Sequence, residues 1–572
     1  MKTSLKYIKK YKKEIVLGPL FKLIEASFEL LIPLVVARII DLGIGGDDTS
    51  IVIKSSILMI ILGFLGLFFS VTAQYFCARA AVGFGSIIRK KLFEKIQTFS
   101  YTRLDREGTA TLITRLTSDV STVQNGVNLF LRLVLRSPFI VFGAAIMAFF
   151  VDTAGALNFV CAIPILALII FVITVITVPL HKKVQKKLDE VLSLTDENVG
   201  GARVIRAFLR EDAEYAGFKE KNRALYSLQK LQGRFSALMN PVTYVVINAA
   251  TITLLWTGAL RVDRGLILTG AVVALFNYMS QILVEMIKFA TVIVSITKAK
   301  ASLDRIDAVL FSKDDETKVS SEKAYDGKVC FDNVTLRYSK DADPSLEGVS
   351  FSVADGESIG IIGGTGSGKT SLVNLIGALY LPESGTVSVD GRDILSRDKD
   401  ELLSKIAYVP QKSVLFKGTV RDNLLWGDEN ADDDTLWDAL RIAQADDFVR
   451  EKGGLSAPVS QKGQNFSGGQ RQRLCVARAL VRKAEIIVFD DSSSALDFAT
   501  DKAMRKALKN LSYSPCIFTV SQRTASVMGC DKIIVLDDGR VAGVGTHESL
   551  LSSCPVYKEI YDSQFKAGGA KA

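Results

Sequence analysis

The sequence predicts two fused folds: a membrane-embedded, all-α bundle of six helices with long cytoplasmic helical extensions, and an α/β domain built around a phosphate-binding loop. Hydrophobic residues make up 48% of the 572-residue chain, which is high for a soluble protein, and they are concentrated before about residue 300. Apolar strand-like runs and helix-like runs alternate from residue 327 onward, as in α/β domains. The segment Gly363–Thr370 fits the phosphate-loop pattern G-x-x-x-x-G-K-[ST].

These patterns divide the chain into four parts. Residues 1–311 are the predicted transmembrane domain, and a charged, weakly apolar linker follows at 312–326. Residues 327–565 are the α/β domain, and 566–572 form a short tail of small and basic residues that we expect to be disordered.

Six apolar stretches are of spanning length, judged against the roughly 20 residues that a helix needs to cross a bilayer. They lie at approximately 14–42, 53–78, 128–152, 155–180, 239–262 and 267–296. Six lysines precede the first stretch, as expected for a cytoplasmic N-terminus that is not a cleaved signal peptide. We interpret residues 1–13 as a short interfacial helix, with a solvated basic tail as the alternative.

Charged residues interrupt several of these stretches. Such charges are costly at membrane depth and usually face a water-filled cavity or a charged partner, so we expect the bundle to surround a pathway. For Arg38 and Lys288 the alternative is that they snorkel from a span end. The remaining charges are Glu25, Glu29, Arg132, Arg136 and Glu285.

The two long connections, 79–127 and 181–238, are rich in Lys and Arg, which places them in the cytoplasm with the N-terminus. Arg261 and Arg264 fall on the outer side and run weakly against that rule. Apolar residues recur at helical spacing in both connections, so we expect helices that continue from the membrane into the cytoplasm.

The net charge of +9 is explained by this membrane pattern, so no nucleic-acid partner is expected. The seven cysteines are scattered and read as free thiols in a reducing compartment.

The phosphate loop lies between a strand-like run, 358–362, and a helix-like run that starts at Ser371. Its glycines allow successive backbone N–H groups to point inward and form an anion nest. Lys369 can reach nucleotide phosphates, and the Thr370 hydroxyl can bind Mg²⁺. The candidate loop residues are Gly363, Gly364, Thr365, Gly366, Ser367, Gly368, Lys369, Thr370 and Ser371.

A second motif, Phe466-Ser467-Gly468-Gly469-Gln470, follows the loop by about a hundred residues and precedes the apolar run 486–489, which ends at Asp490. With these residues the chain resembles an ATP-binding cassette (ABC) exporter half-transporter over nearly its whole length, with Phe466 in place of the family's usual Leu. The resemblance implies that Ser467, Gly468, Gly469 and Gln470 contact ATP bound to a second subunit, so the working unit is a dimer.

The same resemblance assigns further roles in this sequence. Tyr338 matches the aromatic residue that stacks on adenine, and Gln411 matches a residue that reaches the metal. Thr370, Gln411 and Asp490 are then the expected Mg²⁺ ligands. The segment 494–497 matches a loop that communicates between the two ATP sites. Segments 114–120 and 197–206 resemble the two coupling regions that transmit motion between the ATP-binding domain and the membrane helices.

Two positions depart from the family pattern. Asp491 stands where the family usually has a Glu that polarises water, and Gln522 stands where it has a histidine. Asp is one methylene shorter, and general-base catalysis depends strongly on geometry, while Gln cannot carry an imidazole's charge. Gln461 also replaces an acid common in exporters. Neutral drift could explain both substitutions. However, the phosphate-binding residues are intact while both hydrolytic positions differ, which favours a site that binds ATP but hydrolyses it poorly.

We therefore expect a heterodimer in the plasma membrane, in which this chain holds Mg·ATP at a degenerate site and gives its signature motif to a partner half-transporter that carries Glu and His. The bacterial heterodimeric multidrug-type exporters show this pattern. The alternatives are a slow homodimeric lipid or drug exporter and an ATP-gated channel on the same scaffold. The mixed charges and apolar residues of the bundle suit an amphipathic drug, lipid or peptide alike.

Overall fold

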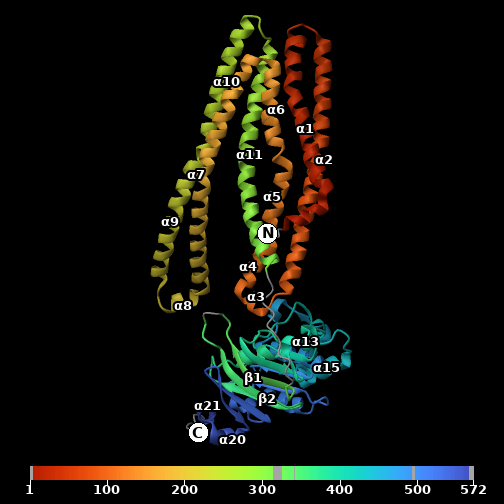
Figure 1. Ribbon diagram of the computed structural model, residues 1–572, viewed down its shortest axis with the longest axis vertical. Helices are drawn as coiled ribbons and strands as arrows, with labels where there is room; N and C mark the ends of the chain where they lie inside the picture. The colour runs from red at the N-terminus through yellow and green to blue at the C-terminus, as the bar shows by residue number, and fades with distance from the viewer. Residues whose placement is uncertain (1–3, 313–324, 340–341, 493–495, 566–572) are drawn as a thin grey trace. The chain divides into compact units, whose positions relative to one another are not determined.

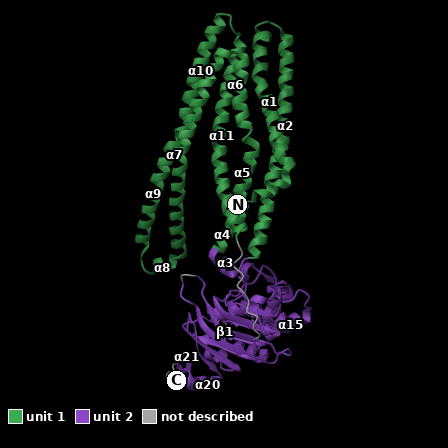
Figure 2. Ribbon diagram, viewed as in Figure 1, with its two compact units in different colours: residues 1–98, 107–312 green, residues 99–106, 313–572 purple. Residues whose placement is uncertain are grey.

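The computed structural model describes residues 4–312, 325–339, 342–492 and 496–565, so the predicted linker, apart from its ends, and the predicted tail lie outside the described residues. The chain forms two compact units (Figure 2). The helical unit comprises Met1–Thr98 and Glu107–Ser312, and the α/β unit comprises Phe99–Arg106 and Lys313–Ala572.

The helical unit is all-α, and its elements are named in Figure 1. They are η1 (Ser4–Tyr11), α1 (Lys12–Arg38), η2 (Ile39–Ile44), α2 (Thr49–Gln97), α4 (Thr109–Thr114), η3 (Arg115–Asp119), α5 (Val120–Leu133), α6 (Arg136–Val151), α7 (Thr153–Gly200), α8 (Ala202–Ala207), α9 (Glu211–Ala237), α10 (Met239–Asp263) and α11 (Thr269–Leu310). Helix α1 packs on α2, and α7 packs on α9 and α10, while α11 contacts α1, α5, α6, α7 and α10. Helices α5, α6 and α11 thus form the middle of this unit (Figure 1).

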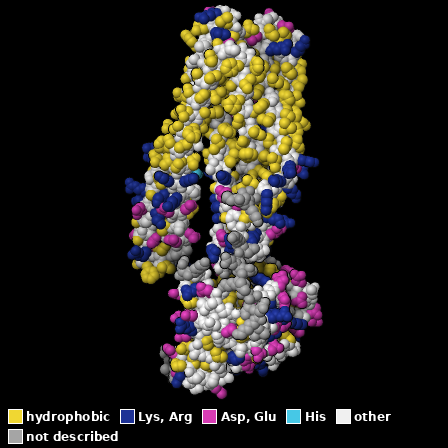
Figure 3. Space-filling model, viewed as in Figure 1, with side chains coloured by type: hydrophobic (Ala, Val, Ile, Leu, Met, Phe, Trp, Pro, Cys, Tyr) yellow, Lys and Arg dark blue, Asp and Glu magenta, His cyan; other side chains and the backbone are white. Residues whose placement is uncertain are grey.

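Within the described residues, five helical stretches are long and apolar enough to cross a membrane: Thr49–Gln97, Thr109–Val151, Thr153–Gly200, Glu211–Asp263 and Thr269–Leu310. Apolar side chains cover the corresponding part of the unit, with Lys and Arg gathered at both of its ends (Figure 3). The sixth predicted span, 14–42, is helical in α1 but does not meet the same criterion, because any 18 consecutive residues of α1 include Lys22, Glu25 and Glu29. The chain is thus a multi-pass membrane protein.

The expected cytoplasmic extensions are present as helix. Helices α2 and α7 run for 49 and 48 residues without interruption, which at 1.5 Å per residue is far more than a bilayer's thickness. Each begins with an aspartate that caps free backbone N–H groups: the Asp48 side chain accepts from Ser50 and Ile51, and the Asp152 side chain accepts from Gly155. Such caps fix where a helix starts.

The described part of the basic N-terminal segment is a short helix, as predicted, and its place at a membrane interface stays a prediction. It forms the 3₁₀ helix η1, whose Ser4 backbone N–H donates to Asp307 near the end of α11 at 3.0 Å. Tyr11 packs beside the buried Cys77 of α2. The first residues therefore tie α1, α2 and α11 together.

The α/β unit contains three sheets. Its strands are β1 (Val329–Leu336), β2 (Leu346–Val353), β3 (Ser358–Gly363), β4 (Ser384–Val389), β5 (Arg392–Asp393), β6 (Ile406–Val409), β7 (Gly418–Thr419), β8 (Pro458–Val459), β9 (Ile486–Asp490), β10 (Cys516–Val520), β11 (Lys532–Asp537) and β12 (Arg540–Gly545). One sheet has the order β2-β1-β4-β5, the largest has the order β12-β11-β3-β10-β9-β6, and β7 pairs with β8. In the largest sheet every pair but β11–β12 is parallel, and β9 is buried along its whole length, as expected of strands covered on both faces.

The helices of this unit are mostly short. They are α3 (Tyr101–Glu107), α12 (Lys369–Ile376), η4 (Ile394–Ser396), α13 (Lys399–Ser404), α14 (Val420–Leu424), α15 (Asp433–Ile442), α16 (Asp446–Glu451), η5 (Gly454–Ser456), η6 (Gln461–Gly463), α17 (Gly468–Val481), α18 (Phe498–Lys509), α19 (Thr524–Val527), α20 (His547–Ser553) and α21 (Pro555–Phe565). One apolar core lies where α12 meets the main sheet and the β1–β2–β4 sheet, and a second surrounds α14, α15 and α17.

One segment of the predicted transmembrane domain belongs elsewhere. Residues Phe99–Arg106, which include most of α3, cluster with the α/β unit, whereas 114–120 stay in the helical unit. The prediction that 114–120 are the first coupling region stays a prediction. The chain leaves α3 at Gly108, whose φ of +73° is strained for other residues. The second predicted coupling region, 197–206, spans the end of α7 and most of α8 in the helical unit and stays a prediction.

Candidate functional site: a phosphate-loop pocket and a charged helical bundle

The predicted nucleotide residues converge at the carboxyl ends of four neighbouring parallel strands. Strand β3 runs into the phosphate loop, β9 ends at Asp490, β10 ends two residues before Gln522, and β6 ends two residues before Gln411. In open parallel sheets this edge is where ligands bind. Residues that lie far apart in the chain thus share one pocket of about 260 Å³.

Almost all the residues that line this pocket are ones that the sequence singled out. The lining residues are Ser345, Thr365, Gly366, Gly368, Lys369, Thr370, Ser371, Gln411, Asp490, Asp491, Val520 and Gln522. The two that the sequence analysis missed, Ser345 and Val520, contribute through their position: one precedes β2 and the other ends β10. Gly363, Gly364 and Ser367 complete the loop without lining the pocket.

The phosphate loop has the backbone that an anion nest requires. Gly366 and Gly368 have φ of +85° and +92°, which residues with a side chain rarely adopt. A Cβ on Gly368 would come within 2.5 Å of the Ser345 carbonyl, so a larger residue would push these segments apart. Helix α12 begins at Lys369 and directs its first N–H groups toward the loop, the end of a helix that attracts anions.

Lys369 is buried at the base of the loop. Its Nζ donates to the carbonyl oxygens of Gly363 at 3.0 Å and of Gly364 at 2.5 Å. Burial lowers the pKa of the Lys369 ammonium, and the carboxylates of Asp490 and Asp491 oppose that shift. The lysine is thus positioned within the loop by backbone carbonyls.

The oxygen donors expected for Mg²⁺ are adjacent. Thr370 Oγ1 donates to Asp490 Oδ1 at 2.9 Å, and the Tyr408 hydroxyl lies 3.1 Å from Asp490 Oδ2. Burial raises the pKa of Asp490, and the hydrogen bonds from Thr370 and Tyr408 oppose that shift. Hydroxyl, amide and carboxylate oxygens suit Mg²⁺, which usually completes its shell with phosphate oxygens and water. Among the described residues no group of three or more His, Cys, Asp or Glu could hold a metal ion, so Thr370, Gln411 and Asp490 would need those phosphates.

Asp491 lies at the edge of the same pocket in an unusual backbone conformation. Its φ is +48°, a region that Asp tolerates better than most residues. Its backbone N–H donates to the Val520 carbonyl at 3.1 Å, and its carbonyl accepts from Gln472 of α17 at 3.3 Å. Burial raises the pKa of the Asp491 carboxyl, and a hydrogen bond with Gln411 opposes the shift. The backbone of Asp491 is therefore held by β10 and α17, and its side chain by Gln411.

Tyr338, the expected adenine platform, is 39% exposed. Its hydroxyl donates to Ser371 at 2.9 Å, and its ring meets Tyr380 edge-on at 4.9 Å. The Tyr380 hydroxyl in turn donates to Asp105 of α3 at 2.5 Å. Tyr380 thus joins the expected adenine platform directly to α3, a connection that no sequence motif indicates.

The signature motif opens helix α17 on the surface of the unit. Ser467 is the N-cap: its hydroxyl accepts from the Gln470 N–H at 3.2 Å, while the Gln470 side chain accepts from the Ser467 N–H at 3.0 Å. This reciprocal pair is a capping box. Phe466 is buried against Phe448, which explains how a ring fits at this position. Within the described residues, the motif does not line this chain's own phosphate-loop pocket.

The predicted segment 494–497 is described only in part. Ser494 and Ala495 lie outside the described residues. Leu496 is buried, and Asp497 caps α18 by accepting from the Thr500 N–H at 2.9 Å.

Charged residues inside the helical unit pair with one another. Arg136 of α6 donates to Glu285 of α11 and to Glu29 of α1, both at 2.6 Å, and Lys288 reaches Glu285 at 2.9 Å. Lys22 pairs with Glu25 at 2.5 Å. The pairing of Lys288 leaves no need for it to snorkel from a span end. At the end of α10, Arg261 pairs with the buried Asp152 at 2.8 Å, which compensates its charge.

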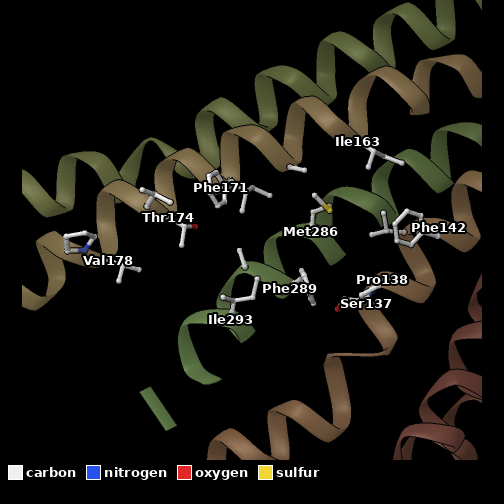
Figure 4. A pocket seen from close by; sticks show the side chains of 16 residues that line it. Ser137, Pro138, Phe142, Ile163, Phe171, Thr174, Val178, Met286, Phe289 and Ile293 are labelled. Atoms are coloured by element: carbon white, nitrogen blue, oxygen red, sulfur yellow. The ribbon is translucent and has the colours of Figure 1, made fainter. Parts of the chain in front are cut away.

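Polar and apolar cavities accompany this network. An apolar cavity of about 730 Å³ lies between α6, α7 and α11 and is lined by side chains such as Phe142, Phe171 and Phe289 (Figure 4). Ser137, the residue after Arg136, stands at its edge. An apolar space beside buried charges suits an amphipathic ligand.

Comparisons with known proteins agree with this architecture. Residues 15–286 match the family model described as ABC transporter transmembrane region, and residues 346–494 match the one described as ABC transporter. The chain is similar to a bacterial Atm1-family ABC exporter solved with ATP bound, with a TM-score of 0.79 and 21% identity over 97% of this chain and 98% of that one. That likeness concerns the fold.

Curated relatives align over the full chain. An uncharacterized ABC transporter ATP-binding protein of Mycobacterium tuberculosis is 36% identical over 98% of this chain and 97% of the relative. One from Bacillus subtilis is 34% identical over all of both chains. The ATP-dependent lipid A-core flippase of Desulfotalea psychrophila is 29% identical over 83% of this chain and 84% of its own length. The chain therefore belongs to the ABC transporter family, as a half-transporter that joins one transmembrane region to one ATP-binding domain.

Proposed function

We propose that this chain is one subunit of a heterodimeric, ATP-driven exporter that moves an amphipathic substrate out of the cytoplasm. Membership of the ABC family supports ATP-driven transport. The direction of transport is supported by two similar proteins, one an exporter and the other a flippase. The pocket with Thr370, Gln411 and Asp490 is the proposed Mg·ATP site.

The observation that carries the heterodimer proposal is the pair Asp491 and Gln522 in an otherwise complete pocket. General-base catalysis typically contributes about 10²–10⁴ in rate and needs the base within hydrogen-bond reach of its proton. Asp491 is a methylene shorter than the expected Glu and is hydrogen-bonded to Gln411. Its carboxylate is therefore less able to reach a water above the γ-phosphate.

No histidine of this chain takes the place of Gln522 in the described pocket. His547 lies in α20, with its Nδ1 at 2.7 Å from the Tyr557 hydroxyl. His181 lies in α7 of the helical unit. The site thus keeps the groups that bind phosphate and lacks the usual pair that promotes its cleavage.

The signature motif supports the second half of the proposal. Ser467 and Gly468 are exposed at the capped start of α17, where backbone N–H groups and the helix dipole favour a phosphate. In a heterodimer this end of α17 would complete the ATP site of the partner. That partner would carry Glu and His at the positions of Asp491 and Gln522.

The test compares the chain alone with the complex it forms with its co-purifying half-transporter. We expect little ATPase activity from the chain alone. In the complex, Ser467→Ala should lower turnover by roughly tenfold or more, while Asp491→Asn should change it by less than about twofold. Asp491→Glu combined with Gln522→His should raise turnover.

A homodimer would behave differently. Robust ATPase activity of the chain alone that Asp491→Asn abolishes would overturn the heterodimer proposal, because it would show that Asp491 itself supports hydrolysis. Lys369→Met, which removes a phosphate-binding group, is the control that separates loss of nucleotide binding from loss of hydrolysis.

A further inference from the structure

A basic cavity lies inside the helical unit, on the α1–α2 side of α6. It measures about 580 Å³ and is lined by Lys22, Ser70, Val71, Gln74, Arg132, Leu133, Arg136 and Lys288. Four of these eight side chains are cations, and none of the eight is an acid. The neighbouring cavity of about 350 Å³, by contrast, is lined by Glu29 and Glu285 as well as Lys288.

The charges around this cavity do not balance. Three carboxylates pair with its cations: Glu25 with Lys22, and Glu29 and Glu285 with Arg136, while Lys288 shares Glu285. Four cations against three acids leave one positive charge. Arg132 is the cation without an acid: among the described residues its partner is the neutral side chain of Gln74, at 2.9 Å.

A second observation points to a missing acceptor. Arg136 is 7% exposed, yet its Nε–H has no hydrogen-bond partner among the described residues. An unpaired donor on a buried guanidinium is costly, and so is an uncompensated cation within a membrane span. An anion in the cavity would compensate the charge of Arg132.

We propose that this cavity binds the singly charged anionic head group of an amphiphile, with Arg132 as the residue that selects its charge. Ser70 and Gln74 add neutral polar groups to the wall, which suits a phosphodiester or carboxylate oxygen. A net charge of one is compensated by a monoanion.

The apolar part of the ligand is inferred from the neighbouring space. Ser137 and Met286 line the apolar cavity of Figure 4, and they stand next to Arg136 and within two residues of Lys288 in the sequence. The two cavities border the same turns of α6 and α11 but share no lining residue, so apolar contact within the basic cavity itself comes from Val71 and Leu133. Naming the amphiphile as the transported class rests on the proposed function, whereas the binding site itself does not.

The test measures binding without nucleotide, so that it stays independent of ATPase activity and transport. The probes are radiolabelled lysophosphatidylglycerol, a monoanion, and lysophosphatidylcholine, a zwitterion, with the same acyl chain, added to the full chain in a non-ionic detergent. Soluble glycerophosphoglycerol is the competitor that carries the head group without the chain. We expect saturable binding that favours the anion by roughly tenfold or more, the range of a charged hydrogen bond.

Matched variants assign the charge selection to Arg132. Arg132→Gln should remove the preference for the anion, and Arg132→Lys should keep most of it. Gln74→Glu should also remove it, because a carboxylate beside Arg132 supplies the missing negative charge within the protein. Lys54→Gln, at an exposed cation of α2 outside the cavity, should bind as the unmodified chain does.

Three results would overturn the proposal. Equal binding of the two lipids would show that the cavity does not select an anion. An unchanged preference in both Arg132→Gln and Gln74→Glu would remove Arg132 from the site. Competition by glycerophosphoglycerol at the same concentration as the lipid would show a site for small anions and not for amphiphiles. If binding holds but no ATP-dependent transport follows, the exporter proposal fails and the site stands.

Discussion

The ion network that joins α1, α6 and α11 allows a quantitative prediction about the stability of the helical unit. The Arg136 side chain is 8% exposed and Glu285 is 3% exposed, whereas Glu29 is 37% exposed. Glu285→Gln keeps the size of the side chain but removes its charge, and leaves Arg136 with Glu29 alone. Breaking one half of a buried ion pair costs about 3–5 kcal/mol.

Two further variants, Glu29→Gln and the double replacement of Arg136 and Glu285 by Met, should destabilise the helical unit less than Glu285→Gln does. Glu29→Gln leaves the Arg136–Glu285 pair intact and removes a partner that is more than a third exposed, so we expect about 1 kcal/mol or less. Replacing Arg136 and Glu285 together by Met removes both charges. Such replacements are often neutral or stabilising by about 1–4 kcal/mol, so the double variant should be more stable than Glu285→Gln.

The buried thiol of Cys77 provides a local assay. It lies 0% exposed on α2 among Tyr11, Ile15 and Leu131, so a maleimide can reach it only when α2 separates from its neighbours. In a chain whose other six cysteines are alanine, Glu285→Gln should speed alkylation of Cys77 by about a hundredfold or more, the equivalent of 3 kcal/mol.

The reasoning is refuted if Glu285→Gln and Glu29→Gln speed alkylation equally, since burial would then not decide the cost. It is also refuted if the double Met variant reacts as fast as Glu285→Gln. In that case the side chains would matter for packing and not for charge compensation.

Three further predictions concern the α/β unit. Tyr380→Phe removes the hydrogen bond to Asp105 but keeps the ring; because this contact is solvent-exposed we expect only about 1 kcal/mol, seen as faster hydrogen exchange in α3 with nearly unchanged ATP binding. Lys369→Met should weaken Mg·ATP binding by roughly a hundredfold, measured by equilibrium titration of a fluorescent ATP analogue, and unchanged affinity would contradict the assigned pocket. Burial would raise the pKa of Asp390, but hydrogen bonds from two lysines, one of them Lys328, hold that pKa below its usual range. Its contribution to stability is therefore present above the ordinary carboxyl range and is lost as pH falls through the lowered pKa; Lys328→Met should move this acid loss to higher pH in unfolding followed between about pH 3 and pH 7.

The nucleotide pocket was predictable because local patterns specify it. The apolar runs that end at Gly363 and Asp490 form buried parallel strands, and such strands present their following residues at one edge of a sheet. The long helices α2 and α7 were predictable for a similar reason, since apolar spacing continues past the membrane without proline in the extensions. In each case neighbours in sequence decide the structure.

Other features depend on contacts between distant residues. The order β3-β10-β9-β6 brings Tyr408 beside Asp490, although 82 residues separate them. Tyr380 meets Asp105 across 275 residues. Neither tyrosine belongs to a motif, so nothing local distinguished it from an ordinary core residue. The break after α3 had a local signal: Gly108, inside an otherwise helical pattern, has a positive φ and interrupts the helix.

Helix α1 shows where a composition rule reaches its limit. Its charges exclude it from the set of helices that length and hydropathy select. In the folded unit those charges are compensated, since Lys22 pairs with Glu25 and Glu29 with Arg136. A rule that selects spans by hydropathy and by the number of charged residues does not take into account whether those charges are paired in the folded protein.

The capping box of the signature motif has a consequence for how a phosphate could be recognised. The Ser467 oxygen is an acceptor in the cap, so its own proton remains available for donation to an incoming oxyanion. The cap therefore aims a donor outward and fixes the oxygen that carries it before any ligand arrives. Thr at this position would retain both properties, whereas Ala would lose them together, so in the proposed dimer the serine would link helix initiation and phosphate recognition in a single hydroxyl.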